Sequence, residues 1–90
     1  MYEIKPTTRF KKDLRSIIKR GYNIALLNAA LVILASGEQL PEKYKDHSLG
    51  GNWVSHRECH ITPDWLLVYK IEADILVLTL TRTGSHSDLF

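Results

Sequence analysis

The sequence predicts an α+β fold, in which an N-terminal strand and an αα-hairpin pack on an antiparallel sheet of about four strands. Two observations predict this fold. Between residues 8 and 36, apolar side chains recur at helical spacing, and after residue 52 three strand-like segments alternate with short turns. The chain has 90 residues, which is enough for a small domain to fold without disulfides or metals. We therefore expect a single domain spanning residues 1–90.

A short strand and a first helix are predicted at the N-terminus. Residues 1–5 alternate apolar and polar side chains, and Pro6 ends that strand. Thr7 or Thr8 is a suitable N-cap for a helix, because a hydroxyl can accept a hydrogen bond from a free backbone N–H of the first turn. Gly21 lies where a left-handed residue is expected after the end of this helix.

A second helix and a long loop are predicted to follow. Asn23 can cap a helix over residues 24–36, which is apolar almost all round and should therefore be covered on more than one side. Residues 37–52 contain Pro41, Gly50 and Gly51 and show no clear periodicity, so we expect a loop. Loops of this length in so small a domain are often functional, and this one contains Lys45 and His47.

The second half of the chain is predicted to form a three-stranded meander. Its strand-like segments are residues 53–61, 65–71 and 75–82. The first two are joined by a Pro63-Asp64 turn, since Pro presets φ and Asp favours turn positions. The last two segments are richly apolar and are expected at the centre of the sheet, covered by the helices.

Antiparallel pairing of these segments predicts a cluster of reactive side chains. His60, Asp64 and Arg82 would meet at one end of the sheet, and His47 and His86 are close enough along the chain to join them. RNA cleavage needs a base, an acid and a cation for the charge that develops on the phosphate, and these residue types supply all three without metal. Each residue also has a plainer interpretation, as a surface histidine, a turn aspartate or an ion-paired arginine.

A metal site is the alternative for the same stretch, because histidine, cysteine and aspartate are all ligand types. Their spacing matches no structural zinc pattern, and the adjacent residues Cys59 and His60 point to opposite faces of a strand. We therefore predict no metal and no cofactor.

The charge distribution points to an anionic partner. The net charge is +2, but residues 1–45 hold nine Lys and Arg against four Asp and Glu, whereas residues 46–90 hold three against six. One face of the first helix is basic, and the alternatives for such a face are an ordinary solvated surface or docking on phosphates. The candidate phosphate-binding residues on it are Arg9, Lys11, Lys12, Arg15 and Lys19.

The remaining composition suggests a cytoplasmic protein. Cys59 is the single cysteine, which suits a reducing compartment, and charged residues interrupt the N-terminus where a signal peptide would be apolar. The longest apolar run, residues 24–35, is too short to span a bilayer, so no membrane partner is expected.

Four segments together resemble a known family. Residues 10–14, 44–53, 57–69 and 82–90 closely resemble the YafQ branch of the RelE/ParE toxin superfamily. The combination of a KDH-x-L-x-G loop with H-x-x-PDW and R-x-G-x-H is far more specific than any one motif, and the resemblance covers nearly the whole chain.

The resemblance implies a RelE-like fold and a ribosome-dependent mRNA endoribonuclease of a bacterial type II toxin–antitoxin pair. Such toxins cut A-site codons by attack of the 2′-hydroxyl, which leaves a 2′,3′-cyclic phosphate, and they use no metal. It also implies a site with two groups of residues. The catalytic residues are His47, His60, Asp64, Arg82 and His86, and the substrate-binding residues are Lys45, Trp65 and Phe90.

The role of each catalytic residue is a hypothesis at this point. We assign His47 or His60, with Asp64, as the base, His86 as the acid and Arg82 as the phosphate-binding cation. Expected partners are the ribosome with its A-site mRNA and a cognate DinJ/RelB-like antitoxin, which is a ribbon-helix-helix dimer. Operator DNA is expected to bind only through this antitoxin. Two other functions stay open: a ParE-like gyrase-inhibiting toxin, which lacks the histidine-rich set, and a non-catalytic binding module.

Overall fold

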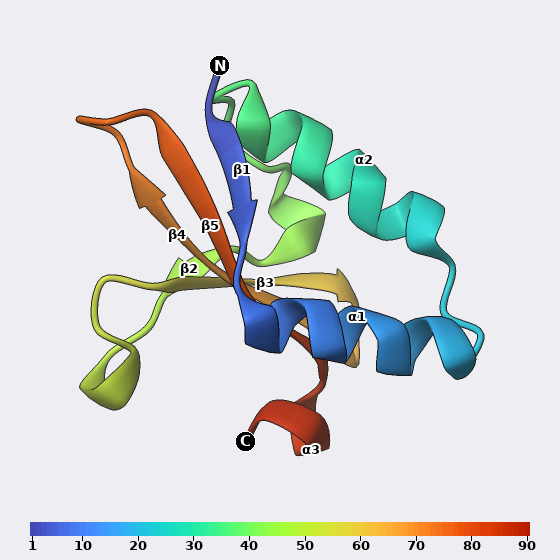
Figure 1. Cartoon of the computed structure of the whole chain (residues 1–90). Coiled ribbons are helices and arrows are strands. Elements are labelled where there is room, and N and C mark those ends of the chain that lie inside the picture. The colour runs from blue at the N-terminus through green and yellow to red at the C-terminus, as the bar shows by residue number, and fades with distance from the viewer.

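The structure, a computed structural model, describes all 90 residues and contains one five-stranded sheet with three helices (Figure 1). The strand order in the sheet is β1-β5-β4-β3-β2. Two short 3-10 turns, η1 and η2, lie in the connection from α2 to β3. In chain order the elements are β1 Glu3–Pro6, α1 Thr8–Lys19, α2 Ile24–Ala35, η1 Glu42–Tyr44, β2 His47–Ser48, η2 Gly51–Trp53, β3 Arg57–Thr62, β4 Trp65–Glu72, β5 Val77–Ser85 and α3 His86–Leu89.

Both predicted helices are present, and their caps explain where they begin. The Thr7 hydroxyl accepts a hydrogen bond from the backbone N–H of Phe10 at 3.0 Å, which starts α1. The Asn23 side chain accepts from Ala25 N at 3.1 Å and starts α2. Gly21, between the helices, has a φ of 81° and so occupies the left-handed conformation predicted for it.

The antiparallel meander is confirmed for β3, β4 and β5. The sheet nevertheless has five strands rather than about four, and it is mixed. The strand β1 pairs parallel with β5, since the chain crosses over through α1 and α2 before the meander begins. The fifth strand is β2, two residues of the predicted loop that pair antiparallel with β3.

Two strand boundaries differ from the prediction. Residues 53–56 were expected to belong to the first strand of the meander, but η2 ends at Trp53 and Ser55 has a φ of 72°, so regular pairing with β4 starts at Arg57. The last strand begins at Val77, after a turn in which Leu76 has a φ of 54°, and it extends to Ser85. Residues 86–89 then form the helix α3.

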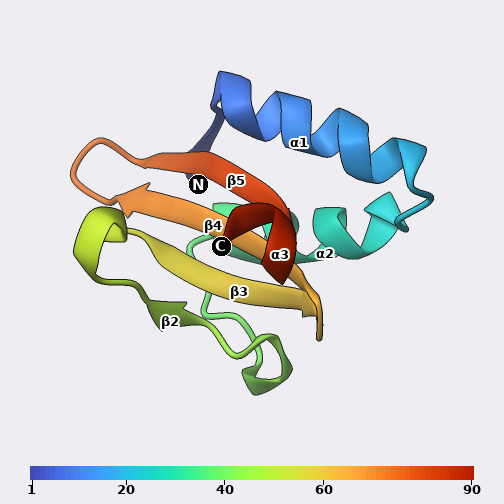
Figure 2. The ribbon, with the colours of Figure 1, turned by 90° about the horizontal axis from the view of Figure 1, so that it is seen from below.

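The hydrophobic core lies between α1 and α2 and one face of the sheet. Its members include Ile17 of α1, Leu27 of α2 and Tyr69 of β4, each no more than 2% exposed. Cys59 of β3 is fully buried on this side as well. Figure 2 shows α3 in front of the sheet, on the face opposite α2. None of the helices is long and apolar enough to cross a membrane.

Candidate active site

Two histidines flank a buried carboxylate at the edge of the open sheet face. His47 of β2 pairs with Glu58 of β3, and His60 lies two residues beyond Glu58 and so on the same face. The Glu58 Oε1 atom is 3.4 Å from His47 Nε2 and 4.0 Å from His60 Nε2. The two rings are 6.3 Å apart, and Glu58 is only 7% exposed. The carboxylate therefore lies within ion-pair distance of either imidazole when that ring is protonated.

Backbone carbonyls fix the orientation of both rings. His47 Nδ1 is 2.8 Å from the carbonyl oxygen of Lys45, and His60 Nδ1 is 3.3 Å from that of Pro63. A carbonyl can only accept, so Nδ1 must be the donor in each ring. Each Nε2 is then turned toward Glu58, and in a neutral ring it carries the lone pair that a general base requires.

A polar cluster anchors the chain just before His47. The Asp46 carboxylate accepts hydrogen bonds from the hydroxyl of Tyr69, at 2.5 Å, and from Nε of Arg57, at 3.2 Å. Burial and the bond to Asp46 raise the pKa of Tyr69, so the hydroxyl remains a donor. Burial lowers the pKa of Arg57, but the charge of Asp46 and the hydrogen bonds with Tyr69 and Asp46 together outweigh burial, so the pKa is raised. The residues adjacent to His47 and Glu58 are thus fixed to the central strand.

The C-terminal helix brings His86 and Phe90 to the end of the sheet that carries Asp64. The Asp64 Oδ1 atom accepts a long hydrogen bond, 3.5 Å, from the backbone N–H of His86. The rings of His86 and Phe90 are 5.5 Å apart, and Phe90 is 54% exposed. His60 is tied to the same turn through Pro63. The structure therefore brings four of the predicted residues, His60, Asp64, His86 and Phe90, to one region of the sheet.

Arg82 is placed differently from this group. Its Nε and one Nη donate to the two carboxylate oxygens of Asp13 on α1, at 2.7 and 3.1 Å. The Thr83 backbone N–H donates to the same carboxylate at 3.1 Å. The hydrogen bond and charge of Asp13 raise the pKa of Arg82 against the effect of burial. The guanidinium fork is thus occupied by Asp13, while its other Nη forms no hydrogen bond within the chain.

The two remaining predicted substrate residues differ in exposure. Trp65 is 2% exposed, lies edge-on to Tyr22 at 5.0 Å and donates from its indole nitrogen to the Thr83 hydroxyl at 2.9 Å. This position makes Trp65 part of the core and leaves no ring face for a nucleotide. Lys45 is exposed, with a left-handed φ of 50°, and has no acidic partner within ion-pair distance.

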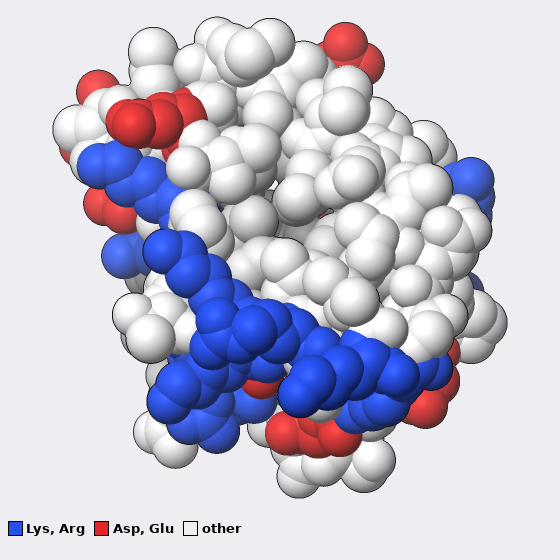
Figure 3. Space-filling view, turned by 45° about the vertical axis from the view of Figure 1, so that its right-hand side comes forward, with Lys and Arg blue, Asp and Glu red and all other residues white.

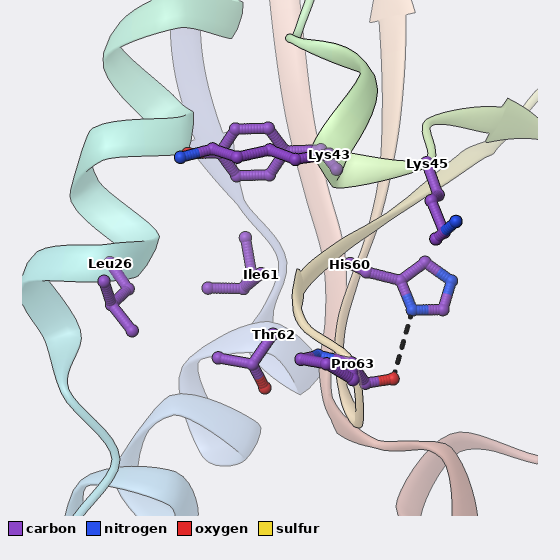
Figure 4. Close-up of a pocket in the computed structure, with 8 residues that line it drawn as sticks. Leu26, Lys43, Lys45, His60, Ile61, Thr62 and Pro63 are labelled. Atoms are coloured by element: carbon purple, nitrogen blue, oxygen red, sulfur yellow. Dashed lines mark hydrogen bonds between the residues drawn. The ribbon is translucent and has the colours of Figure 1, made fainter.

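An apolar groove of about 380 Å³ lies beside this region. Leu26 of α2 forms one wall, and Ile61 and Thr62 of β3 point toward it (Figure 4). His60 and Lys45 also line the groove, although their side chains extend away from Leu26 in the same view. The groove therefore reaches His60, whereas His47 and His86 do not line it.

The basic face predicted for the first helix is exposed on α1. Figure 3 shows Lys and Arg side chains forming a continuous band across this side of the molecule. No acidic side chain lies within ion-pair distance of its predicted members, so their charges are free to meet an anionic partner. These members are Arg9, Lys11, Lys12, Arg15 and Lys19, all of them exposed.

Sequence reasoning missed Glu58, although a signal for it was present. Alternation along the predicted strand places Glu58 and His60 on one face. What the sequence did not reveal is that β2 brings His47 across from Glu58. No three or more His, Cys, Asp or Glu side chains gather in a geometry that could hold a metal ion.

A family model described as a bacterial toxin of a type II toxin–antitoxin system, YafQ, matches residues 2–90. The mRNA interferase toxin YafQ of Escherichia coli K12 is 35% identical over 89 residues, which cover 98% of this chain and 95% of that protein.

Solved structures with a similar chain were also found. A metal-bound toxin from Helicobacter pylori matches with a TM-score of 0.93 and 44% identity, and both chains are covered completely. A chain of the E. coli DinJ–YafQ complex matches with a TM-score of 0.91 and 34% identity, over 100% of this chain and 99% of that one.

Proposed function

The chain belongs to the YafQ family of bacterial type II toxin–antitoxin toxins, and from this membership we propose that it is an mRNA interferase, an endoribonuclease that inhibits translation. We propose further that it cuts A-site codons of ribosome-bound mRNA in the cytoplasm. The observation that carries the catalytic part is the arrangement of His47 and His60 around the buried Glu58 carboxylate. This arrangement supports a histidine base, because the negative charge of Glu58 lies close to the ring that takes up the proton.

The proposed reaction begins at the 2′-hydroxyl of the scissile nucleotide. The Nε2 atom of His47 or His60 takes the hydroxyl proton, and Glu58 stabilises the resulting imidazolium through its negative charge. The 2′-oxygen then forms a bond to phosphorus, and the bond from phosphorus to the 5′-oxygen breaks. His86 gives a proton to the departing 5′-oxygen. The products are a 2′,3′-cyclic phosphate and a free 5′-hydroxyl.

Three other predicted residues have supporting roles in this proposal. Asp64 holds the start of α3 through the His86 N–H, which makes it an orienting group for the acid. Arg82 offers its remaining Nη to a phosphate oxygen while Asp13 holds its fork. Phe90 lies beside His86 with an exposed ring on which the nucleobase can stack.

The proposed chemistry uses no metal ion, because side chains supply the base, the acid and the cation. Cleavage is therefore expected to continue unchanged when a Zn²⁺-selective chelator is added and Mg²⁺ is held at the concentration that keeps the ribosomes intact. A loss of cleavage that added Zn²⁺ restores would contradict this part of the proposal.

We propose a cognate antitoxin as the protein partner. The relative in the E. coli complex is bound to DinJ, and this chain matches it over its whole length. An antitoxin of the DinJ/RelB type, with a ribbon-helix-helix dimer domain, would bring operator DNA to the complex. Co-expression with a DinJ-like antitoxin should yield a co-purifying complex that is inactive in translation assays.

We also propose that the basic face of α1 contacts ribosomal RNA. Each phosphate contact that is lost should weaken binding and flatten its dependence on salt. Replacing Lys11, Lys12 and Arg15 by Glu tests this, with ribosome affinity measured over a range of ionic strength. Unchanged affinity and salt dependence would refute the contact.

Mapping of cut sites on translated transcripts tests the function as a whole. The wild type should cut within A-site codons, whereas His86→Ala should be slower by about 10²–10⁴-fold, the usual contribution of a general acid. Glu58→Gln should also be slow, because it cannot stabilise an imidazolium. Asp74→Ala is the control, since Asp74 is exposed in the turn between β4 and β5, at the opposite end of β4 from Asp64. Wild-type protein that leaves every transcript intact would refute the nuclease.

A further inference from the structure

Two charged side chains, Asp13 of α1 and Arg20 at the C-cap of that helix, face the C-terminal segment of the chain. Asp13 and Arg20 are seven positions apart, which places them on the same face of the helix. Asp13 binds Arg82 near the end of β5, and Arg20 Nη1 binds Asp88 of α3 at 2.9 Å. Figure 2 shows α1 running along β5, with α3 following directly from that strand. The helix α1 thus holds the segment that carries His86 at two points.

The helix α3 has little to stabilise it by itself. It has four residues, and isolated helices of that length do not persist in water. A capping box links the N-cap residue Ser85 to Asp88, the third residue of the helix: Ser85 N donates to Asp88 Oδ2 at 2.8 Å, and Asp88 N donates to the Ser85 hydroxyl at 3.2 Å. Gly84 permits this tight turn, since it has a φ of 156° and an added Cβ would lie 3.0 Å from Asp88 Oδ2.

Arg20 is held in place from its other side. A second guanidinium nitrogen, Nη2, donates to the Tyr22 hydroxyl at 2.7 Å, and the group lies 5.0 Å from the centre of the Tyr22 ring. Tyr22 in turn packs against the buried Trp65. The neighbouring cation Lys19 has no such partners, so Arg20 differs from the free cations of the basic face.

We propose that Arg20 is a positioning residue for RNA cleavage: by holding Asp88 it fixes α3, and with it His86 and Phe90, over the sheet. The role in cleavage rests on the proposed function. An exposed ion pair adds little to global stability. A four-residue helix has few other contacts, however, so even a small contribution changes how often it opens.

Amide hydrogen exchange of the free protein tests the structural half without RNA. The reporters are the amides of Asp88 and Phe90, which are bonded within α3. Arg20→Ala should speed their exchange by roughly two- to fivefold, the factor expected for an exposed ion pair, with Tm almost unchanged. Lys19→Ala removes a neighbouring cation without a partner and should leave both amides at the wild-type rate.

Cleavage kinetics test the other half. Arg20→Ala should lower kcat by about tenfold, because small misplacements of a catalytic group are costly, and leave KM for ribosomes near the wild-type value. Arg20→Lys should recover part of kcat. Asp88→Asn keeps a capping oxygen but loses the charge, and the Arg20→Ala, Asp88→Asn double variant should be no slower than the slower single variant.

Two results would overturn this inference. One is unchanged exchange at Asp88 and Phe90 in Arg20→Ala, whatever the activity of the protein. The other is an Arg20→Ala effect confined to KM and salt dependence, as expected if Arg20 were only one more cation for docking. A wild-type protein that cuts no RNA would instead refute the proposed function and leave the exchange result standing.

Discussion

The ion pair between Asp13 and Arg82 allows a quantitative test of how α1 is joined to the sheet. The two side chains are 13% and 14% exposed, and they form two hydrogen bonds, with a third from Thr83 N to the same carboxylate. Removing one partner of a buried pair typically costs about 3–5 kcal/mol, because the other charge is left unpaired. Allowing for the remaining exposure, we expect Asp13→Ala to lower the free energy of unfolding by about 2–4 kcal/mol.

The assay is guanidinium denaturation followed by circular dichroism, with the m value compared between variants. In a domain of this size the expected loss corresponds to a fall in Tm of about 10 °C or more. The double variant Asp13→Ala, Arg82→Met removes both charges and should regain about half of the loss or more, since no unpaired guanidinium remains. Asp74→Ala, an exposed turn carboxylate, is the control and should stay within about 0.5 kcal/mol of the wild type.

A loss below about 1 kcal/mol in Asp13→Ala would refute this reasoning, since it would place the pair among ordinary surface ion pairs. A double variant less stable than Asp13→Ala would refute the argument from an unpaired charge. In that case the packing of the Arg82 side chain, rather than its charge, would be the main contribution.

Three further predictions concern other parts of the chain. Tyr69→Phe should cost about 1.5–3 kcal/mol in chemical denaturation, because Asp46 loses a buried donor; a neutral result would mean that the hydroxyl does not anchor the loop. The bond from Ser85 N and the pair with Arg20 hold the pKa of Asp88 below its ordinary value of 3.8. The Asp88 charge therefore contributes its full stabilisation above pH 3.8, and this contribution is lost as the pH falls through the lower pKa of the folded state. Urea titrations should thus give wild type and Asp88→Asn free energies of unfolding that converge at acid pH. Burial raises the pKa of the Cys59 thiol to about 12, so iodoacetamide at about pH 8 should label the native protein at least 10²-fold more slowly than the denatured chain; rapid native labelling would contradict the burial of Cys59.

The fold was largely predictable because local signals agreed with one another. The caps at Thr7 and Asn23, the left-handed Gly21 and the three apolar segments each have a local physical cause, and the structure contains all of them. The parallel pairing of β1 with β5 could not be obtained in this way. It joins residues more than 70 positions apart, and no local property of residues 3–6 selects β5 as their neighbour.

The candidate site was likewise predictable only in part. His60, Asp64 and Arg82 were predicted together because a meander returns the chain to one sheet end, and His86 was expected to join them because it follows Arg82 closely along the chain. The hydrogen bond from His86 N to Asp64 agrees with the expectation for His86. Trp65 and Arg82 show the limit of this reasoning. Side-chain type does not reveal that one ring packs inside against Tyr22, or that the guanidinium fork is bound by Asp13.

The sequence alone determined the two long helices, the three strands of the meander, the family resemblance and the set of reactive side chains, since these depend on residue type, spacing and neighbouring residues along the chain. Tertiary structure alone decided which of those side chains face one another. Glu58 lies between two imidazoles because β2 pairs with β3, and Arg82 turns to α1 because that helix crosses beside β5. The physical reason is that charge and hydrogen-bond energies depend on distances of a few ångströms, which only the packed chain defines.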